Sequence, residues 1–165
     1  MAGVVFDSTY LIDLFNPKLT GDRRAALDTL VAELSKARTR ILIPAPCLTE
    51  LLIKAAAARD QYVQQLGTSS AFDVIPYDRR AATECALLLA EAWDSKTQKA
   101  VTRTKFKFDW MIVACAASRD VQRIYTDDAD IQRCASLRGI QTVRQADLRV
   151  PPESRQMRIP DGDLD

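Results

Sequence analysis

Four acidic residues from distant parts of the sequence follow apolar runs that indicate strands, or begin the helices expected after them. In an open parallel sheet, ligands gather beyond the carboxyl ends of the strands. We therefore expect the four side chains to converge at one end of a sheet. They are Asp7, Glu50, Asp109 and the neighbouring pair Asp127 and Asp128, of which either could be the fourth.

Clustered carboxylates are the ligands that a hard divalent cation prefers. Mg²⁺ takes oxygen ligands in octahedral geometry at about 2.1 Å and keeps several waters, and Mn²⁺ accepts similar ligands. Such a cation lowers the pKa of water and neutralises the charge that grows on a phosphate during displacement. The acids therefore predict a Mg²⁺ or Mn²⁺ site, with Asp127 and Asp130 as further candidate ligands.

Each acid also has a structural explanation. Asp7 and Asp109 are placed to cap helices, and Glu50 near a helix start interacts favourably with the helix dipole. The acids between 127 and 130 are typical of an Asx-type turn. No single position decides between the two interpretations, but the order of the acids and their contexts favour a site.

The composition excludes several other chemistries. The chain has 165 residues, a net charge of +1 and no histidine. Catalytic triads that use histidine, metal-free RNA cleavage by paired histidines and Cys/His zinc sites are therefore excluded. The four cysteines are scattered without a C-x-x-C pair, and we expect buried, reduced thiols. They are Cys47, Cys85, Cys115 and Cys134.

Hydrophobic residues make up 47% of the chain and charged residues 27%, which is typical of one globular domain. No apolar run approaches the roughly 20 residues of a membrane span. The first residues lack the basic region of a signal peptide, so we expect a cytoplasmic protein.

Strand-like and helix-like segments alternate, which predicts an α/β fold with a parallel sheet and helices on both faces. We expect a domain over residues 1–147 and an irregular, proline-containing tail over 148–165. The expected strands, buried on both faces, are 4–6, 41–43, 72–75, 124–126 and 140–143. The expected helices, the first beginning after Asp7, include 22–37, 47–66, 79–93, 109–117 and 130–137.

A basic segment, expected to be a loop, lies directly before Asp109. It contains five positive residues and no acid between Lys96 and Lys107. Charge runs are usually solvated surface, but the position beside Asp109 makes a guide for the phosphate backbone an alternative. The candidate RNA-binding residues are Lys99, Arg103, Lys105 and Lys107.

The contexts of the acids resemble those of PIN-domain ribonucleases, in particular their VapC-like toxin branch. The residues 4–9 (Val-Val-Phe-Asp-Ser-Thr) are similar to the family's opening strand, and 46–51 (Pro-Cys-Leu-Thr-Glu-Leu) to the segment with its helix glutamate. The residues 108–114 (Phe-Asp-Trp-Met-Ile-Val-Ala) resemble its third acidic motif, and 125–130 (Tyr-Thr-Asp-Asp-Ala-Asp) its final Thr-x-Asp-x-Asp. The resemblance covers about residues 3–147 in the family's order.

This resemblance implies a PIN-like α/β/α sandwich and a Mg²⁺- or Mn²⁺-dependent endoribonuclease, the toxin of a toxin–antitoxin pair. It makes Asp7, Glu50, Asp109 and Asp128 both catalytic and metal-holding. It puts Asp127 at the variable position of the last motif. Ser8 and Thr126 would support them. The implied partners are RNA, an antitoxin that inserts an arginine into the acidic site, and a second copy in a homodimer. Candidate apolar contacts for the antitoxin are Leu51, Leu52 and Ala55.

Two alternatives stay open. A haloacid-dehalogenase-like phosphatase also begins with a strand and an aspartate, but it requires Asp-x-Asp where this chain has Asp7-Ser8-Thr9. A non-catalytic PIN-like scaffold would bind RNA without cutting it, although unused clustered carboxylates would only lower stability. Metal-dependent cleavage of RNA, compared with turnover of a phosphatase substrate, distinguishes the three.

Overall fold

The computed structural model describes residues 3–94 and 103–152, and within them the strands form one parallel sheet. The strands are β1 (Gly3–Phe6), β2 (Arg40–Pro44), β3 (Phe72–Ile75), β4 (Arg123–Tyr125) and β5 (Gln141–Val143). Their order in the sheet is β3-β2-β1-β4-β5, and every pairing is parallel. The α/β class predicted from the alternation of segments is confirmed.

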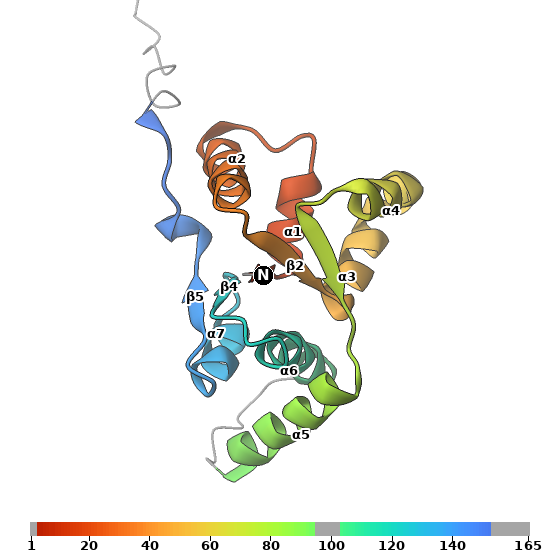
Figure 1. Cartoon of the computed structure of the whole chain (residues 1–165), viewed down its shortest axis with the longest axis vertical. Helices are drawn as coiled ribbons and strands as arrows, with labels where there is room; N and C mark the ends of the chain where they lie inside the picture. The colour runs from red at the N-terminus through yellow and green to blue at the C-terminus, as the bar shows by residue number, and fades with distance from the viewer. Residues whose placement is uncertain (1–2, 95–102, 153–165) are drawn as a thin grey trace, which may run out of the picture.

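Helices connect the strands and cover the sheet. They are α1 (Ser8–Phe15), α2 (Gly21–Lys36), α3 (Ala45–Ala55), α4 (Arg59–Thr68), α5 (Arg79–Asp94), α6 (Arg103–Ala117) and α7 (Ala129–Ser136). In Figure 1, α2 lies above the strands, and α5, α6 and α7 are grouped below them. Among the described residues, no helix combines the length and apolar character that a membrane crossing requires.

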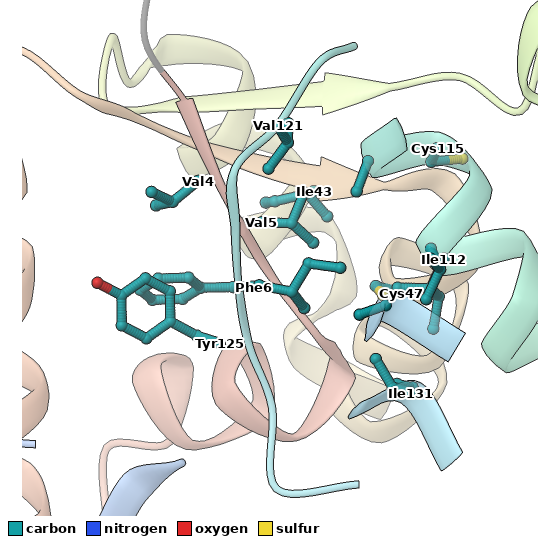
Figure 2. Close-up of a cluster of buried hydrophobic side chains, with 14 of the residues drawn as sticks. Val4, Val5, Phe6, Ile43, Cys47, Ile112, Cys115, Val121, Tyr125 and Ile131 are labelled. Atoms are coloured by element: carbon teal, nitrogen blue, oxygen red, sulfur yellow. The ribbon is translucent and has the colours of Figure 1, made fainter. Parts of the chain in front are cut away.

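The core is built around β1, whose side chains alternate between the two faces of the sheet. Figure 2 shows Val4 and Tyr125 on one side of β1, and Val5 with Ile112 on the other. The expectation that strands are buried on both faces holds for β1, where Val5 and Phe6 are fully buried. It is wrong for β3 and β5, which are only partly buried because they form the two edges of the sheet.

Short polar signals place several helix ends correctly. Asp7 caps α1 and accepts a hydrogen bond from Tyr10 N at 3.0 Å, and Asp78 accepts one from Ala81 N at 3.0 Å at the start of α5. Gly139 adopts a φ of 64° just after α7, a conformation that disfavours residues with a Cβ. The four cysteines are buried and free, as expected.

The single helix expected over 47–66 is wrong, because a 3₁₀ turn, η1 (Ala56–Ala58), separates α3 from α4. Ala56 has a φ of 46°, which breaks the helix without glycine or proline. The break lets α4 reach the end of α1. There the Tyr62 hydroxyl donates to the Phe15 carbonyl at 2.9 Å, and the two ring centroids lie 5.1 Å apart.

The helix expected to open at Asp109 begins earlier, at Arg103. Asp109 therefore lies in the second turn of α6, and the expectation of a loop up to Lys107 is wrong for the residues 103–107. The physical reason is that these residues include neither glycine nor proline, so the apolar helix continues backwards through them. Of the expected tail, the residues 148–152 are described, and the division at residue 147 stays a prediction.

Candidate metal centre

Three aspartates on α6 and α7 bring carboxylate oxygens close together. One oxygen from each of Asp109, Asp128 and Asp130 lies within 4.8 Å of the others. We call these residues the aspartate triad. Asp109 is buried, and the other two are partly exposed. Asp128 and Asp130 directly follow β4, so the triad that they form with Asp109 lies at the carboxyl end of the sheet, where a parallel α/β fold binds ligands.

The start of α7 fixes the position of two members of the triad. The Asp128 side chain accepts hydrogen bonds from Asp130 N at 2.7 Å and from Ile131 N at 3.3 Å, as a helix N-cap does. Asp130 lies in the first turn, where a negative charge interacts favourably with the helix dipole, and it pairs with Arg133. The Asx-type turn expected for these acids is thus present at Asp128, and it is compatible with a role in a site.

The triad fits a hard divalent cation. Its donor set is three carboxylates, which suits Mg²⁺ or Mn²⁺ rather than a cation that prefers nitrogen or sulfur. With bonds of about 2.1 Å, oxygens on opposite sides of an octahedral cation lie about 4.2 Å apart. The separations of up to 4.8 Å in the triad are therefore within a small side-chain movement of that geometry.

Asp7 lies deeper and is joined to the triad through a threonine. It is 2% exposed, and its carboxylate accepts a short hydrogen bond from the Thr126 hydroxyl. The same hydroxyl oxygen accepts a hydrogen bond from Asp128 N at 3.0 Å. Thr126 thus bridges Asp7 and the loop that carries Asp128.

The environment of Asp7 disfavours its charged form. The pKa of Asp7 is raised to about 6, chiefly by burial and to a smaller extent by the charges of Asp127 and Asp128. Hydrogen bonds from Thr126 and Tyr10 oppose the shift, because they stabilise the carboxylate. A cation beside Asp7 would favour the ionised form, so this carboxyl is suited to a site that a cation completes.

Besides Asp7, two of the predicted acids lie outside the triad. Glu50 is exposed on α3, in its second turn rather than its first, because the helix begins at Ala45. The buried Cys47 thiol lies near both Asp7 and Glu50, since both charges contribute to its raised pKa after the larger effect of burial. Asp127 is exposed, and its carboxylate accepts a hydrogen bond from Gln145 N at 2.8 Å.

The remaining candidates can be placed only in part. Ser8 is buried beside the Cys47 thiol. Lys99 lies outside the described residues. Arg103, Lys105 and Lys107 lie on α6, the helix that carries Asp109, but their side chains are outside the described part of the chain.

Sequence reasoning missed three residues around these acids. Tyr10 donates its backbone N–H to Asp7, Arg133 pairs with Asp130, and Gln145 donates its backbone N–H to Asp127. The spacing of Arg133 three residues after Asp130 on a helix is a signal that could have found it. A backbone N–H donor such as that of Gln145 has no signal in residue type.

Comparisons with known proteins agree with this architecture. The sequence matches the PIN domain family over residues 4–137. The fold is similar to that of VapBC2 from Rickettsia felis bound to a promoter DNA fragment, with 13% identity, a TM-score of 0.63, and coverage of 86% of this chain and 98% of that chain. DNA-bound VapBC from Salmonella typhimurium gives 20% identity, a TM-score of 0.60, and coverage of 88% and 99%.

A third structure, VapC20 from Mycobacterium tuberculosis, is described as a toxin that cleaves the sarcin-ricin loop. It gives 12% identity, a TM-score of 0.56, and coverage of 79% of this chain and 93% of that chain. No curated protein sequence matches. The structural likenesses, at such low identity, concern the fold alone, whereas the family match spans most of the sequence. The chain belongs to the PIN domain family.

Proposed function

We propose that the chain is a Mg²⁺- or Mn²⁺-dependent endoribonuclease and the toxin of a toxin–antitoxin pair. The observation that carries the proposal is the aspartate triad, whose oxygens lie within 4.8 Å of one another at the carboxyl end of a PIN-domain sheet. Family membership favours this function over a haloacid-dehalogenase-like phosphatase.

In this proposal Asp109, Asp128 and Asp130 hold the cation, and the buried Asp7 completes the anionic site. When bound, the cation would supply an activated water and neutralise the charge that develops on the phosphate during the displacement. Thr126 keeps Asp7 and the Asp128 loop in a fixed relation through its two hydrogen bonds. Glu50, exposed on α3 near Cys47, would face the substrate side and orient the attacking water.

RNA would approach along the start of α6. Arg103, Lys105 and Lys107 precede Asp109 in this helix, and Lys99 precedes them in the sequence. Contacts from these residues to phosphates would supply the affinity that a net charge of +1 does not. Replacing Lys99, Arg103 and Lys105 with Ala should flatten the salt dependence of RNA binding, by about 0.7 in the log–log slope per lost contact.

Cleavage of a defined RNA with Mg²⁺, with Mn²⁺ and with a chelator tests the enzymatic part. We expect cleavage only with metal, and a loss of about 100-fold or more in Asp109→Asn. Asp120→Asn is the matched control, because Asp120 is highly exposed and precedes β4, whereas Asp128 follows it at the other end of the strand. RNA binding without cleavage would favour the scaffold, and turnover of a phosphomonoester instead of RNA would favour a phosphatase.

An antitoxin partner is supported by the solved structures, since two of the similar folds come from VapBC complexes. An arginine of the partner can pair bidentately with the carboxylates and compete with the cation. Of the expected apolar contacts, Leu51 is 1% exposed and belongs to the core, whereas Ile53 on the same helix is 66% exposed. The partner would therefore meet Ile53 rather than Leu51.

Expression of the chain alone and together with its upstream neighbouring gene tests the toxin role. We expect growth arrest from the chain alone, rescue by the neighbour, and co-purification of the two proteins. A chain that cleaves RNA in vitro but is harmless in cells and purifies alone would be a housekeeping nuclease. The same purification, followed by light scattering, tests the homodimer.

A further inference from the structure

The two neighbouring aspartates after β4 make different contacts. Asp128 caps α7 and belongs to the aspartate triad, whereas Asp127 accepts a hydrogen bond from Gln145 N. The backbone hydrogen bonds between the β4 and β5 segments end one residue before Asp127, where Thr126 N donates to Val143 O at 3.0 Å. The Asp127 carboxylate thus continues the connection between the two chain segments where the strand pairing stops.

Gln145 is itself held in place. It begins a short 3₁₀ helix, η2 (Gln145–Asp147), and its side-chain amide donates to the Asp13 carboxylate at 2.7 Å. Asp13 also pairs with Arg23 of α2. Through Gln145, the Asp127 carboxylate therefore ties the loop after β4 to α1 and α2, which do not carry any member of the triad.

We propose that Asp127 is a positioning residue for the cation site and not one of its ligands. Its oxygen holds the loop after β4 against Gln145, so that Asp128 faces Asp109 and Asp130. This inference rests on the proposed function for the identity of the site. The role requires a hydrogen-bond acceptor at position 127 and no charge, which separates it from ligation.

Substitutions on both sides of the hydrogen bond separate these roles. Asp127→Asn keeps an acceptor oxygen without the charge, and Asp127→Ala removes both. Gln145→Pro removes the donor N–H, and Gln145→Ala is its control because it keeps the N–H and removes the side chain. Proline suits the first residue of η2, and Arg144 before it has the extended backbone (φ −88°, ψ 157°) that precedes proline.

The test measures the Mg²⁺ concentration that raises the melting temperature of the full chain by a fixed amount, with Mg²⁺ as the only ligand. We expect Asp127→Ala and Gln145→Pro to raise this concentration about tenfold, the effect typical of losing a group that orients a ligand. Asp127→Asn should stay within about twofold of the wild type. Gln145→Ala, which loses the side-chain bond to Asp13 but keeps the N–H that Asp127 accepts, should lie between the wild type and Gln145→Pro. The double variant Asp127→Ala/Gln145→Pro should be no worse than either single variant, because both remove the same bond.

Equal damage from Asp127→Asn and Asp127→Ala would overturn the inference, because the charge would then matter as a ligand does. It would also be overturned if Gln145→Pro behaved like Gln145→Ala, or if Mg²⁺ did not stabilise the wild type. If Gln145→Pro fails to fold, the two Asp127 variants decide alone. Mg²⁺-dependent stabilisation that follows the expected pattern without RNA cleavage would refute the proposed function and leave this inference standing.

Discussion

Replacing Asp7 by Asn in the metal-free protein should stabilise the fold, and increasingly so as the pH rises. Asp7 is 2% exposed, and its pKa is raised from the ordinary 3.8 to about 6, chiefly by burial. Between pH 3.8 and about pH 6 the Asp7 carboxyl holds a proton in the folded chain that it has lost in the unfolded chain. The stability that Asp7 contributes is therefore fully present below about pH 4 and is lost as the pH rises through 6.

The magnitude follows from the size of the shift. Slightly more than two pH units at 1.36 kcal/mol each gives about 3 kcal/mol lost from the wild type by neutral pH. The amide of Asn does not ionise, so the variant does not lose this amount. The difference in unfolding free energy, variant minus wild type, should rise by about 3 kcal/mol between about pH 3 and pH 7.

Urea unfolding at several pH values, with a chelator present, measures this difference. Taking a difference cancels the groups that titrate alike in both proteins. Asp120→Asn is the control, because Asp120 is exposed and has a φ of 55°, a conformation that Asn also tolerates. A difference for Asp7→Asn that is as flat as the control would refute the reasoning, since it would mean that Asp7 ionises freely in the folded chain.

Three further substitutions test other parts of the site and fold. Asp128→Asn should abolish RNA cleavage but change the unfolding free energy by less than about 0.5 kcal/mol, because Asn caps helices as well as Asp does; a larger loss would make Asp128 chiefly structural. Thr126→Val should cost about 2 kcal/mol in urea unfolding, because the hydrogen bonds to the Asp7 carboxylate and from Asp128 N both disappear. Ala56→Gly should raise the unfolding free energy by about 1 kcal/mol, whereas Ala57→Gly, at a negative φ in the same turn, should lower it by a similar amount; equal losses would mean that Ala56 is not strained.

Local signals in the sequence predicted much of the fold because they act over a few residues. A carboxylate before a helix caps it whatever the rest of the chain does, which is why Asp7 was placed correctly. Short apolar runs between helices likewise predicted the strands and their parallel direction. These features need no knowledge of distances between remote residues.

The two wrong helix predictions have different causes. Ala56 belongs to an alanine run, whose intrinsic preference is helical, yet the packing of Tyr62 against Phe15 imposes a break there. The basic residues before Asp109 were taken for a loop because of their charge, although they are good helix formers. In both places the outcome depends on tertiary contacts or helix propensity rather than on polarity.

The site shows the same division between local and long-range information. The order of the acids predicted that Asp7, Asp109 and Asp128 lie at one end of the sheet, but not which oxygens approach one another. Asp127 and Asp128 make different contacts because Asp127 accepts a hydrogen bond from Gln145 N, eighteen residues later. This donor is a backbone group, so no residue type in the sequence indicates it. Only the path of the chain after β5 brings that donor to the loop.

The burial of Asp7 links the stability of the chain to its cation. At neutral pH the ionised carboxyl lowers stability by about 3 kcal/mol, chiefly because it is buried and to a smaller extent because Asp127 and Asp128 are charged. A ligand that binds only the folded chain adds about 2.7 kcal/mol at a concentration 100 times its dissociation constant. The two magnitudes are similar, so a cation at the aspartate triad can offset the cost of keeping Asp7 charged. A hydrophobic residue at position 7 would be more stable without metal, and the proposed cation site would explain why a buried aspartate is present there.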